Sequence, residues 1–367
     1  MATDTAEQAP ATAAAPARPA PSRVVAAAWV LPLVLLVVAT GLRFYRLGEP
    51  DRLYFDEVYY AEDGADLLRR GVEDGFVVHP PLGKWVIAAS IAVLGDQPVG
   101  WRAGMAVAGS LTVLVTYLAG LRLFRRRGVA ALAAFLGAID GLSFTMRRIS
   151  MLDSALALFV ITGFWLLLRD RDATWAGAEQ AAAESPSADH AVLPRRPHRD
   201  RWLAGLVFGL AIATKWSGLL ALGGAGLLVL ITELSLRKRT TGRWLTAWPR
   251  LVASGLLTLV LVPAVVYVAS YAGWFANFED TRPGQRRCGE DATECTVALP
   301  QLLRDWVGEQ RAIATFHRDL DATHRYRAPA TTWLILARPV AYYYESCTEQ
   351  AQRDKEAEGE ECRQRNA

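Results

Sequence analysis

Two adjacent carboxylates, Asp56 and Glu57, are the first residues along the chain whose type and setting could do chemistry. They follow a long apolar segment and stand in the aromatic run YFDEVYY. Neighbouring acids repel each other, so holding the pair among aromatic rings has an electrostatic cost that a solvated loop would not incur. Such a pair is a candidate general base or cation site. The alternative is an ordinary exposed acidic loop.

Three other segments carry polar residues that could bind a ligand. HPPLGK places His79 before a rigid proline turn, and TKWSG holds Lys215 between two apolar segments. The segment MRRISMLD holds Arg147, Arg148 and Asp153 in a tight connection. An anionic lipid phosphate would explain cations at such places, whereas snorkelling of the arginines to head groups is the alternative. For a lone histidine, a structural hydrogen bond is the alternative.

An acid within an apolar segment adds one more candidate. Asp140 precedes Arg147 and Arg148 by seven and eight residues, which predicts that it lies on roughly the same helical face. An intramembrane acid costs about 2.5 to 3.5 kcal/mol on insertion scales, so it should be paired or line a cavity. Asp140 therefore joins His79, Arg147 and Asp153 as a candidate substrate-binding residue.

These residues together suggest one class of reaction. Transfer of a sugar from a lipid phosphate to a hydroxyl needs a carboxylate to accept the hydroxyl proton and cations to stabilise the departing phosphate. Asp56 and Glu57 would supply the carboxylate, and Arg148 and Lys215 would supply the cations. The hypothesis requires these residues to meet in one pocket at the outer boundary of a membrane.

The composition indicates a protein of the lipid bilayer. Of 367 residues, 52% are hydrophobic and 12 are Trp, and the mean hydropathy is positive. A spanning helix needs roughly 17 to 25 largely apolar residues. The sequence therefore predicts an all-α integral membrane protein with about seven transmembrane helices. The expected spans are residues 24–42, 103–121, 129–146, 154–168, 203–214, 218–236 and 251–271, of which the fourth and fifth are short.

The basic residues predict the orientation of these spans. They cluster after the second span, between the fourth and fifth, and between the sixth and seventh, at Arg122 to Arg127, Arg195 to Arg201 and Arg237 to Arg243. Since short basic loops stay in the cytoplasm, the N-terminus is expected inside and the polar motifs outside. The formal net charge is only +3 and forms no single stripe, which argues against nucleic acid as a partner.

The chain is expected to divide into three parts. Residues 1–22 are predicted to be a disordered cytoplasmic tail, and 23–271 a transmembrane core with an amphipathic outer loop at 43–102. Residues 272–367 are expected to form an extracytoplasmic tail without a clear span. Within the core, the polar stretch 169–201 is expected to be a flexible connector.

All four cysteines lie in the last part of the chain, at Cys288, Cys295, Cys347 and Cys362. On an oxidising outer face they could form disulfides, with three pairings available and local pairing as the simplest guess. Four free thiols are the alternative.

The sequence resembles the protein O-mannosyltransferases, multi-spanning membrane enzymes with the C-type glycosyltransferase fold. The resemblance covers roughly Leu42 to Tyr271 and is greatest to the bacterial branch, which lacks a large luminal insert. It rests on four motifs in the family's order, all predicted on one side of the membrane: FDEVYYAEDGADL, HPPLGKW, RISMLDS and TKWSG.

The resemblance implies a donor, an acceptor and residue roles. The donor would be polyprenyl-phosphate mannose, and the acceptor a Ser or Thr of a secretory protein near the export channel, with inversion at an extracytoplasmic site of the cell membrane. Asp56 matches the presumed catalytic base and Glu57 its acidic neighbour, while Arg148 and Lys215 match positions expected near the donor phosphate. His79 and Asp153 match motif positions with less defined roles. Some relatives in the wider fold use a divalent metal, but one acidic dipeptide does not establish a metal here.

Family members have about eleven spans, so the resemblance also suggests a truncated chain whose activity is in question. The segment HRYRAPATTWLILARPVAYYYES resembles the stretch that precedes the remaining spans. Three alternatives stay open: a transferase acting on a lipid or cell-wall glycan, an inactive partner fragment, and a membrane transporter. Transport is the least favoured, because the charges lie at the ends of spans and no repeated half is visible.

Overall fold

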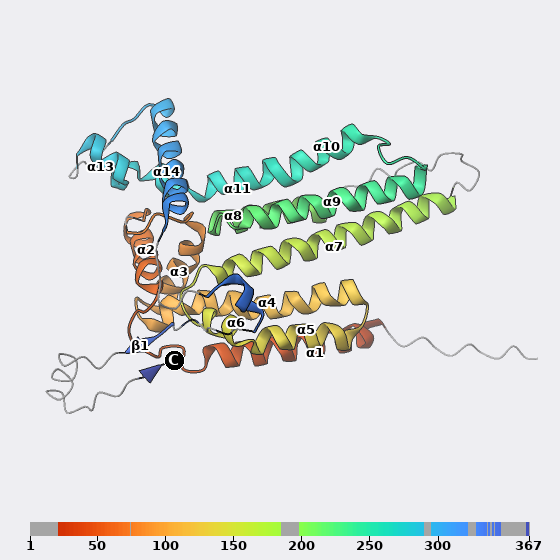
Figure 1. Cartoon of the computed structure of the whole chain (residues 1–367), viewed down its shortest axis with the longest axis horizontal. Helices are drawn as coiled ribbons and strands as arrows, with labels where there is room; N and C mark the ends of the chain where they lie inside the picture. The colour runs from red at the N-terminus through yellow and green to blue at the C-terminus, as the bar shows by residue number, and fades with distance from the viewer. Residues whose placement is uncertain are drawn as a thin grey trace, which may run out of the picture.

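The computed structural model is a bundle of long helices that is covered at one end by shorter ones (Figure 1). It describes residues 21–73, 75–184, 198–289, 295–321, 328–335, 337, 340, 342–345 and 365–366. In this described part of the chain, seven long segments run alternately in opposite directions. They are α1 (Pro21–Phe44), α4 (Pro98–Phe124), α5 (Arg127–Ile139), α7 (Asp153–Glu184), α8 (Arg199–Thr214), α9 (Gly218–Thr241) and the continuous run α10 (Trp248–Leu256), a π-helical turn (Leu257–Leu261) and α11 (Val262–Ser270).

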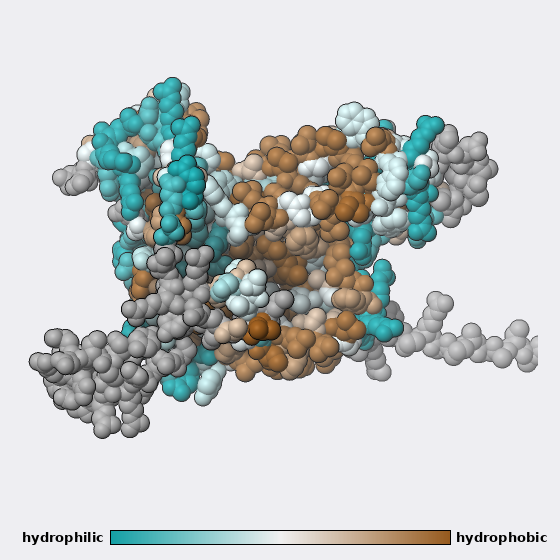
Figure 2. Space-filling view, viewed as in Figure 1, coloured by the Kyte–Doolittle hydropathy of each residue, from teal (hydrophilic) through white to brown (hydrophobic). Residues whose placement is uncertain are grey.

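On the face shown in Figure 2, hydrophobic residues cover the middle of this bundle, and hydrophilic residues lie at both of its ends. Within the described residues, three helical runs are long and apolar enough to cross a membrane: Pro98–Phe124, Gly218–Thr241 and Trp248–Ser270. The other segments of the bundle lie beside them but are shorter or carry charged residues. The expectation of an all-α membrane protein is confirmed.

The expected third span is interrupted. Residues 129–146 do not form one helix, because α5 ends at Ile139 and a short helix, α6 (Gly141–Met146), begins after Asp140. The backbone of Asp140 is extended (φ −56°, ψ 121°), and its carboxylate accepts a hydrogen bond from the Ser143 N–H at 2.8 Å. Asp140 therefore caps α6. The prediction that Asp140 shares a helical face with Arg147 and Arg148 is wrong.

The helix at the expected fourth span is longer than predicted, and it includes the first half of the expected connector. Helix α7 is 32 residues long and continues to Glu184, so residues 169–184 are helical and not a flexible loop. Ionic contacts explain why the polar half remains helical: Asp172 pairs with Arg122 at 3.2 Å, and Arg169 pairs with Asp200 at 3.1 Å. Residues 185–197 lie outside the described residues, as does most of the predicted tail at 1–22.

Shorter helices form a layer across the end of the bundle at which α1, α5, α8 and α11 finish (Figure 1). Two of them, α2 (Glu57–Arg70) and α3 (Leu82–Leu94), form the predicted outer loop, with α3 packed against α4. After α11 come α12 (Ala272–Ala276), a 3₁₀ turn (Phe278–Asp280), α13 (Arg282–Cys288) and α14 (Leu299–Asp319). The last described elements are a 3₁₀ helix (Ala330–Ile335) and an antiparallel pair of two-residue strands, β1 (Tyr344–Glu345) and β2 (Arg365–Asn366).

One disulfide joins Cys288 and Cys295, and it closes the connection between α13 and α14. Local pairing is confirmed for these two residues, and the alternative of four free thiols is wrong. Cys347 and Cys362 lie outside the described residues.

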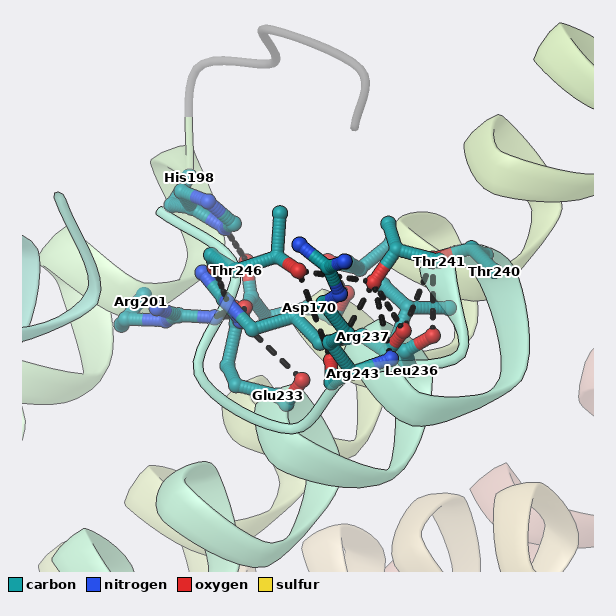
Figure 3. A network of polar contacts seen from close by, with 11 residues as sticks. Asp170, His198, Arg201, Glu233, Leu236, Arg237, Thr240, Thr241, Arg243 and Thr246 are labelled. Carbon is teal, nitrogen blue, oxygen red and sulfur yellow. Dashed lines mark hydrogen bonds and ion pairs between the residues drawn. The ribbon is translucent and has the colours of Figure 1, made fainter. Parts of the chain in front are cut away.

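A buried ionic network links α7, α8 and α9 at the end of the bundle opposite the short helices (Figure 3). Arg201 on α8 donates hydrogen bonds to Asp170 on α7, at 2.7 and 2.9 Å, and to Glu233 on α9. Glu233 also accepts from Arg237, and His198 Nδ1 lies 2.9 Å from Asp170 Oδ1. Two carboxylates therefore balance two guanidiniums, which allows these charges to be buried between three helices.

The network predicts a stability effect that depends on burial. Glu233→Gln should lower the free energy of unfolding by about 3 kcal/mol, because it leaves two buried guanidiniums with one carboxylate. Chemical unfolding in detergent micelles measures this. Asp200→Asn is the matched control, since its pair with Arg169 is partly exposed and should be worth about 0 to 1 kcal/mol. Equal losses in the two variants would contradict the assignment.

Candidate functional site

A lysine and two carboxylates meet at the end of the bundle that the short helices cover. Lys215 lies where α8 ends, in extended backbone (φ −159°, ψ 137°), and its Nζ donates to both carboxylate oxygens of Asp153 at 3.1 Å. Asp153 begins α7, where a carboxylate is favoured by the positive end of the helix dipole. Both side chains are partly exposed, which leaves them accessible to a ligand.

Asp56 lies close enough to Lys215 and Asp153 for their charges to act on it, and we call the surroundings of these three side chains the Asp56 pocket. It immediately precedes α2 and follows Phe55, whose positive φ of 57° is rare for a bulky residue and makes a sharp turn into the helix. Burial raises the pKa of the Asp56 carboxyl, while the charge of Lys215 lowers this pKa and that of Asp153 raises it. A carboxylate with a raised pKa is a stronger base, so its environment suits the acceptance of a proton.

The adjacent Glu57 is engaged differently. Its side chain is fully buried, and Arg102 donates to both of its oxygens, from Nε at 2.8 Å and from Nη2 at 3.0 Å. The backbone N–H of Ser150 donates to the same carboxylate at 2.9 Å. Glu57 therefore ties α2 to α4 and to the connection before α7. Both oxygens of Glu57 accept hydrogen bonds, so this residue is suited to positioning the elements around it and not to accepting a proton.

Arg102 uses every one of its N–H donors. Besides Glu57, its guanidinium donates to the carbonyl oxygens of Leu47 at 3.0 Å, Pro50 at 2.9 Å and Arg52 at 2.9 Å. It also lies over the Tyr54 ring, 5.2 Å from the centroid. The whole turn between α1 and α2 is thus fixed to the start of α4. Our sequence reasoning missed Arg102, although a charged residue at the edge of an expected span was the available signal.

A pair of stacked histidines covers the Lys215 side of the pocket. His79 is buried, and its ring lies 5.2 Å from that of His317 on α14. His317 Nε2 lies 3.0 Å from the carbonyl oxygen of Val78, so it donates to this backbone group. Burial and the charge of Lys215 lower the pKa of His79 to about 3. His79 is therefore neutral at physiological pH and can act as a hydrogen-bonding group but not as a cation.

The two arginines of the MRRISMLD motif point away from this pocket. Arg148 donates to the carbonyl oxygens of Tyr45 at 2.5 Å and Arg46 at 3.3 Å, and it lies over the Phe144 ring. The side chain of Arg147 packs on α4 and reaches toward α5. The structure thus brings Asp56, Asp153, Lys215 and His79 together, whereas Arg148 lies behind Tyr54 and both Arg147 and Asp140 lie beside α5.

A second buried ionic cluster supports the wall of the pocket. Lys84 on α3 contacts Asp63 at 2.9 Å and Glu73 at 2.7 Å, and it donates to the Phe76 carbonyl oxygen at 2.7 Å. Asp63 in turn accepts from the backbone N–H groups of Gly75 and Phe76. These contacts hold the loop between α2 and α3 against the bundle. Because Phe76 contacts Phe316, the loop also seats α14.

Aromatic residues from the end of the described chain cover the acidic side. Tyr342 lies against Phe55 with ring centroids 4.8 Å apart, and Tyr343 lies against Tyr54 at 5.4 Å. Burial and the nearby charges of Asp153 and Asp56 raise the pKa of Tyr342 to about 12. In the described part of the chain, no three His, Cys, Asp or Glu side chains are grouped so that they could hold a metal ion.

Comparison with known proteins decides the family. The family model described as "Dolichyl-phosphate-mannose-protein mannosyltransferase" matches residues 33–101 and 95–277, which include all four motifs. The chain belongs to this family. The predicted resemblance is therefore confirmed, and the pocket around Asp56 lies within the part that the family model matches.

Curated mannosyltransferases of actinobacteria are similar over most of the chain. The polyprenol-phosphate-mannose–protein mannosyltransferase of Mycolicibacterium smegmatis is 32% identical over 330 residues, which cover 86% of this chain and 64% of the relative. That of Mycobacterium tuberculosis is 33% identical, with 86% and 63% covered. The chain thus spans a little under two thirds of the length of these relatives.

A solved structure confirms the fold of this mannosyltransferase family member. The Saccharomyces cerevisiae protein O-mannosyltransferase Pmt1–Pmt2 complex bound to the sugar donor aligns with a TM-score of 0.57 at 20% identity. The match covers 73% of this chain and 37% of the yeast chain. The expected C-type glycosyltransferase fold is confirmed.

Substitution of Arg102 tests the positioning of Asp56. Arg102→Lys keeps the positive charge but has three donors in place of five, so it cannot hold Glu57 and three carbonyls together. Under the function proposed below, this variant should lose mannosyl transfer by at least about tenfold while it is still inserted in membranes. Radiolabel transfer by membranes measures this, and Arg69→Lys on the exposed side of α2 is the control. Full activity of Arg102→Lys would contradict the positioning role.

The Lys84 cluster predicts a dependence of stability on pH. Burial, together with the charge of Asp63, raises the pKa of Glu73 to about 7 although Lys84 lowers it. Between its ordinary pKa and about 7 the folded protein binds more protons than the unfolded chain, so stability should fall as the pH rises through this range. Glu309 on α14 also faces this cluster and raises the pKa of Glu73.

Thermal unfolding in detergent at about pH 5 and about pH 8 measures this dependence. Glu73→Gln should reduce the difference in Tm between the two conditions, because its amide cannot ionise. The exposed Glu62→Gln on the preceding helix, α2, should leave the difference unchanged. A Glu73→Gln variant with the wild-type difference would show that Glu73 does not titrate there.

Proposed function

We propose that this chain transfers mannose from polyprenyl-phosphate mannose to Ser or Thr hydroxyls of exported proteins, with inversion at the sugar carbon. One observation carries the proposal: a partly buried carboxylate, Asp56, shares a pocket with the Lys215–Asp153 pair. The names of the curated relatives supply the donor and the class of acceptor.

The pocket can perform this transfer in one displacement. The acceptor hydroxyl oxygen attacks the anomeric carbon of mannose, and Asp56 accepts the hydroxyl proton. The bond between the anomeric carbon and the phosphate oxygen breaks on the opposite side, and the polyprenyl phosphate leaves with its electron pair. Lys215 stabilises the negative charge that develops on this phosphate. A single displacement inverts the configuration.

Asp153 and His79 would orient the reactants. Asp153 holds the Lys215 ammonium by two contacts of 3.1 Å, so it fixes the direction from which the cation meets the phosphate. His79 is neutral and buried, and its Nδ1 has no hydrogen-bond partner in the described part of the chain, which suits a contact with a sugar hydroxyl. Arg148 would join the phosphate only if it leaves the carbonyl oxygens of residues 45 and 46.

An apolar groove beside the pocket suits a lipid-linked donor. It runs between α9 and α11, has a volume of about 510 Å³, and is lined by Leu219, Leu222, Leu259, Pro263 and Tyr267 among others. At its outer end, Trp216 donates to the Tyr267 hydroxyl at 2.9 Å. Because Trp216 follows Lys215 directly, an isoprenoid chain in this groove would bring its phosphate to the lysine.

The distribution of charge supports an extracytoplasmic site. The described arginines at 122–127, 199–201 and 237–243 lie at the end of the bundle opposite Asp56. If that end is cytoplasmic, the protein is a multi-pass protein of the cell membrane with its N-terminus inside. The pocket then faces the compartment in which exported proteins emerge, which makes the export channel a candidate partner.

Asp56→Asn tests the assignment of the base. The amide cannot accept the hydroxyl proton, so we expect transfer of labelled mannose to a Ser/Thr-rich peptide to fall by at least about a hundredfold. Membranes containing the full chain and polyprenyl-phosphate mannose serve as the assay. Asp51→Asn, an exposed acid of the same turn, should keep its activity.

Two results would count against the proposal. Wild-type activity in Asp56→Asn would remove this residue from the reaction. Transfer to a lipid but not to the peptide would keep the chemistry and change the acceptor.

A further inference from the structure

Two arginines form a second cationic cluster at the outer end of the bundle, away from the Asp56 pocket. Arg43 is the penultimate residue of α1, and Arg147 follows α6. Arg147 lies close enough to Arg43 for its charge to act on the Arg43 guanidinium. The proposed transfer reaction uses neither residue.

Arg147 is held in this position by the shape of α4. Its side chain lies across Gly109, where an added Cβ would be 2.6 to 2.8 Å from three of its carbon atoms. The guanidinium then reaches the Gly137 carbonyl oxygen on α5 at 3.4 Å. Gly137 precedes the end of α5, so the side chain runs back along the bundle. Snorkelling would carry it the other way, toward the head groups.

Arg43 lacks partners for most of its donors. Its side chain is completely buried, and Nη1 donates to the Ala39 carbonyl oxygen at 3.0 Å. Nε and Nη2 are buried and have no hydrogen-bond partner among the residues that the structure describes. An unsatisfied buried donor is destabilising, and more so when the group is charged.

No carboxylate neutralises this cluster in the part of the chain that the structure describes. The charge of Asp140 acts on Arg147, but its carboxylate is exposed and caps the N-terminus of α6. In the ionic network at the opposite end of the bundle, by contrast, two carboxylates balance Arg201 and Arg237. Arg102 is likewise paired with Glu57. Arg43 is thus a buried cation and Arg147 a half-buried one, and no buried carboxylate among the described residues balances them.

We propose that Arg43 and Arg147 form a site for the phosphate of an anionic outer-leaflet lipid in the wall formed by α1, α4, α5 and α6. The half-buried Arg147 donates hydrogen bonds to the phosphate directly, and Arg43 supplies a second positive charge behind it. A guanidinium can donate several hydrogen bonds to a phosphate, and the negative charge of the lipid offsets both cations. This site is separate from the pocket that holds the mannose donor and stabilises the bundle.

Thermal unfolding of the purified full chain in lipid nanodiscs tests the proposal. Replacing phosphatidylcholine by phosphatidylglycerol should raise the Tm of the wild type by several degrees. Arg147→Gln should lose most of this gain. In phosphatidylcholine alone, Arg147→Gln should equal or exceed the wild-type Tm, because it removes a charge without a counterion.

A matched variant and a second measurement keep the test decisive. Arg46→Gln removes an exposed charge three residues after Arg43 and should retain the gain. Native mass spectrometry should show about tenfold weaker retention of phosphatidylglycerol by Arg147→Gln, as loss of one charged hydrogen bond predicts. Arg43→Gln should also weaken retention, because it removes the second positive charge.

Three results would overturn the proposal. One is an equal gain in Tm for the wild type and Arg147→Gln, and another is equal retention of phosphatidylglycerol by them. The third is a gain from inorganic phosphate alone that matches the gain from lipid, which would assign the cluster to a free anion. If Arg43→Gln fails to fold, the comparison of Arg147→Gln with Arg46→Gln still decides.

Discussion

The guanidinium of Arg102 connects the start of α4 to the turn that carries the proposed base. Its donors bind the Glu57 carboxylate and three carbonyl oxygens between α1 and α2, and Glu57 also accepts from the Ser150 N–H. Asp56 precedes Glu57, so its place is set by a contact that it does not make itself. The strained φ of Phe55 is tolerated because both sides of the turn are fixed. A pocket built from distant motifs therefore depends on one arginine.

Much of the fold follows from hydropathy, and the exceptions have local causes. The spans at 103–121 and 218–236 lie within α4 and α9, because long apolar runs have few alternatives in a bilayer. The fourth span was predicted to end at residue 168, because Arg169 and Asp170 are polar. The sequence did not show that both residues form ion pairs with α8, which allow the helix to continue. The helix breaks at Asp140, where the Asp140 carboxylate caps α6 through a hydrogen bond. The mostly apolar sequence around Asp140 does not predict this break.

The candidate site was predictable in part. The motifs identified Asp56, Asp153 and Lys215, and the structure brings them together, because short connections at one end of antiparallel helices must lie close to one another. The sequence did not predict the directions in which the side chains point. Arg147 and Arg148 are adjacent in sequence, yet one lies on Gly109 and the other on the carbonyl oxygen of Tyr45. No pattern in the sequence indicated that His317, far along the chain, stacks on His79.

Helix α14 contacts both α11 and the loop before α3. Gln310 accepts a hydrogen bond from the Tyr267 hydroxyl of α11, and two turns later His317 stacks on His79. A helix is stiff over such a distance, so a tilt of α11 is passed on as a displacement of the histidine pair. Helix tilt in turn follows the thickness of the surrounding bilayer. If α11 tilts with bilayer thickness, α14 would carry this movement to the histidine pair, and the geometry in which the sugar would be held would then depend on the surrounding membrane.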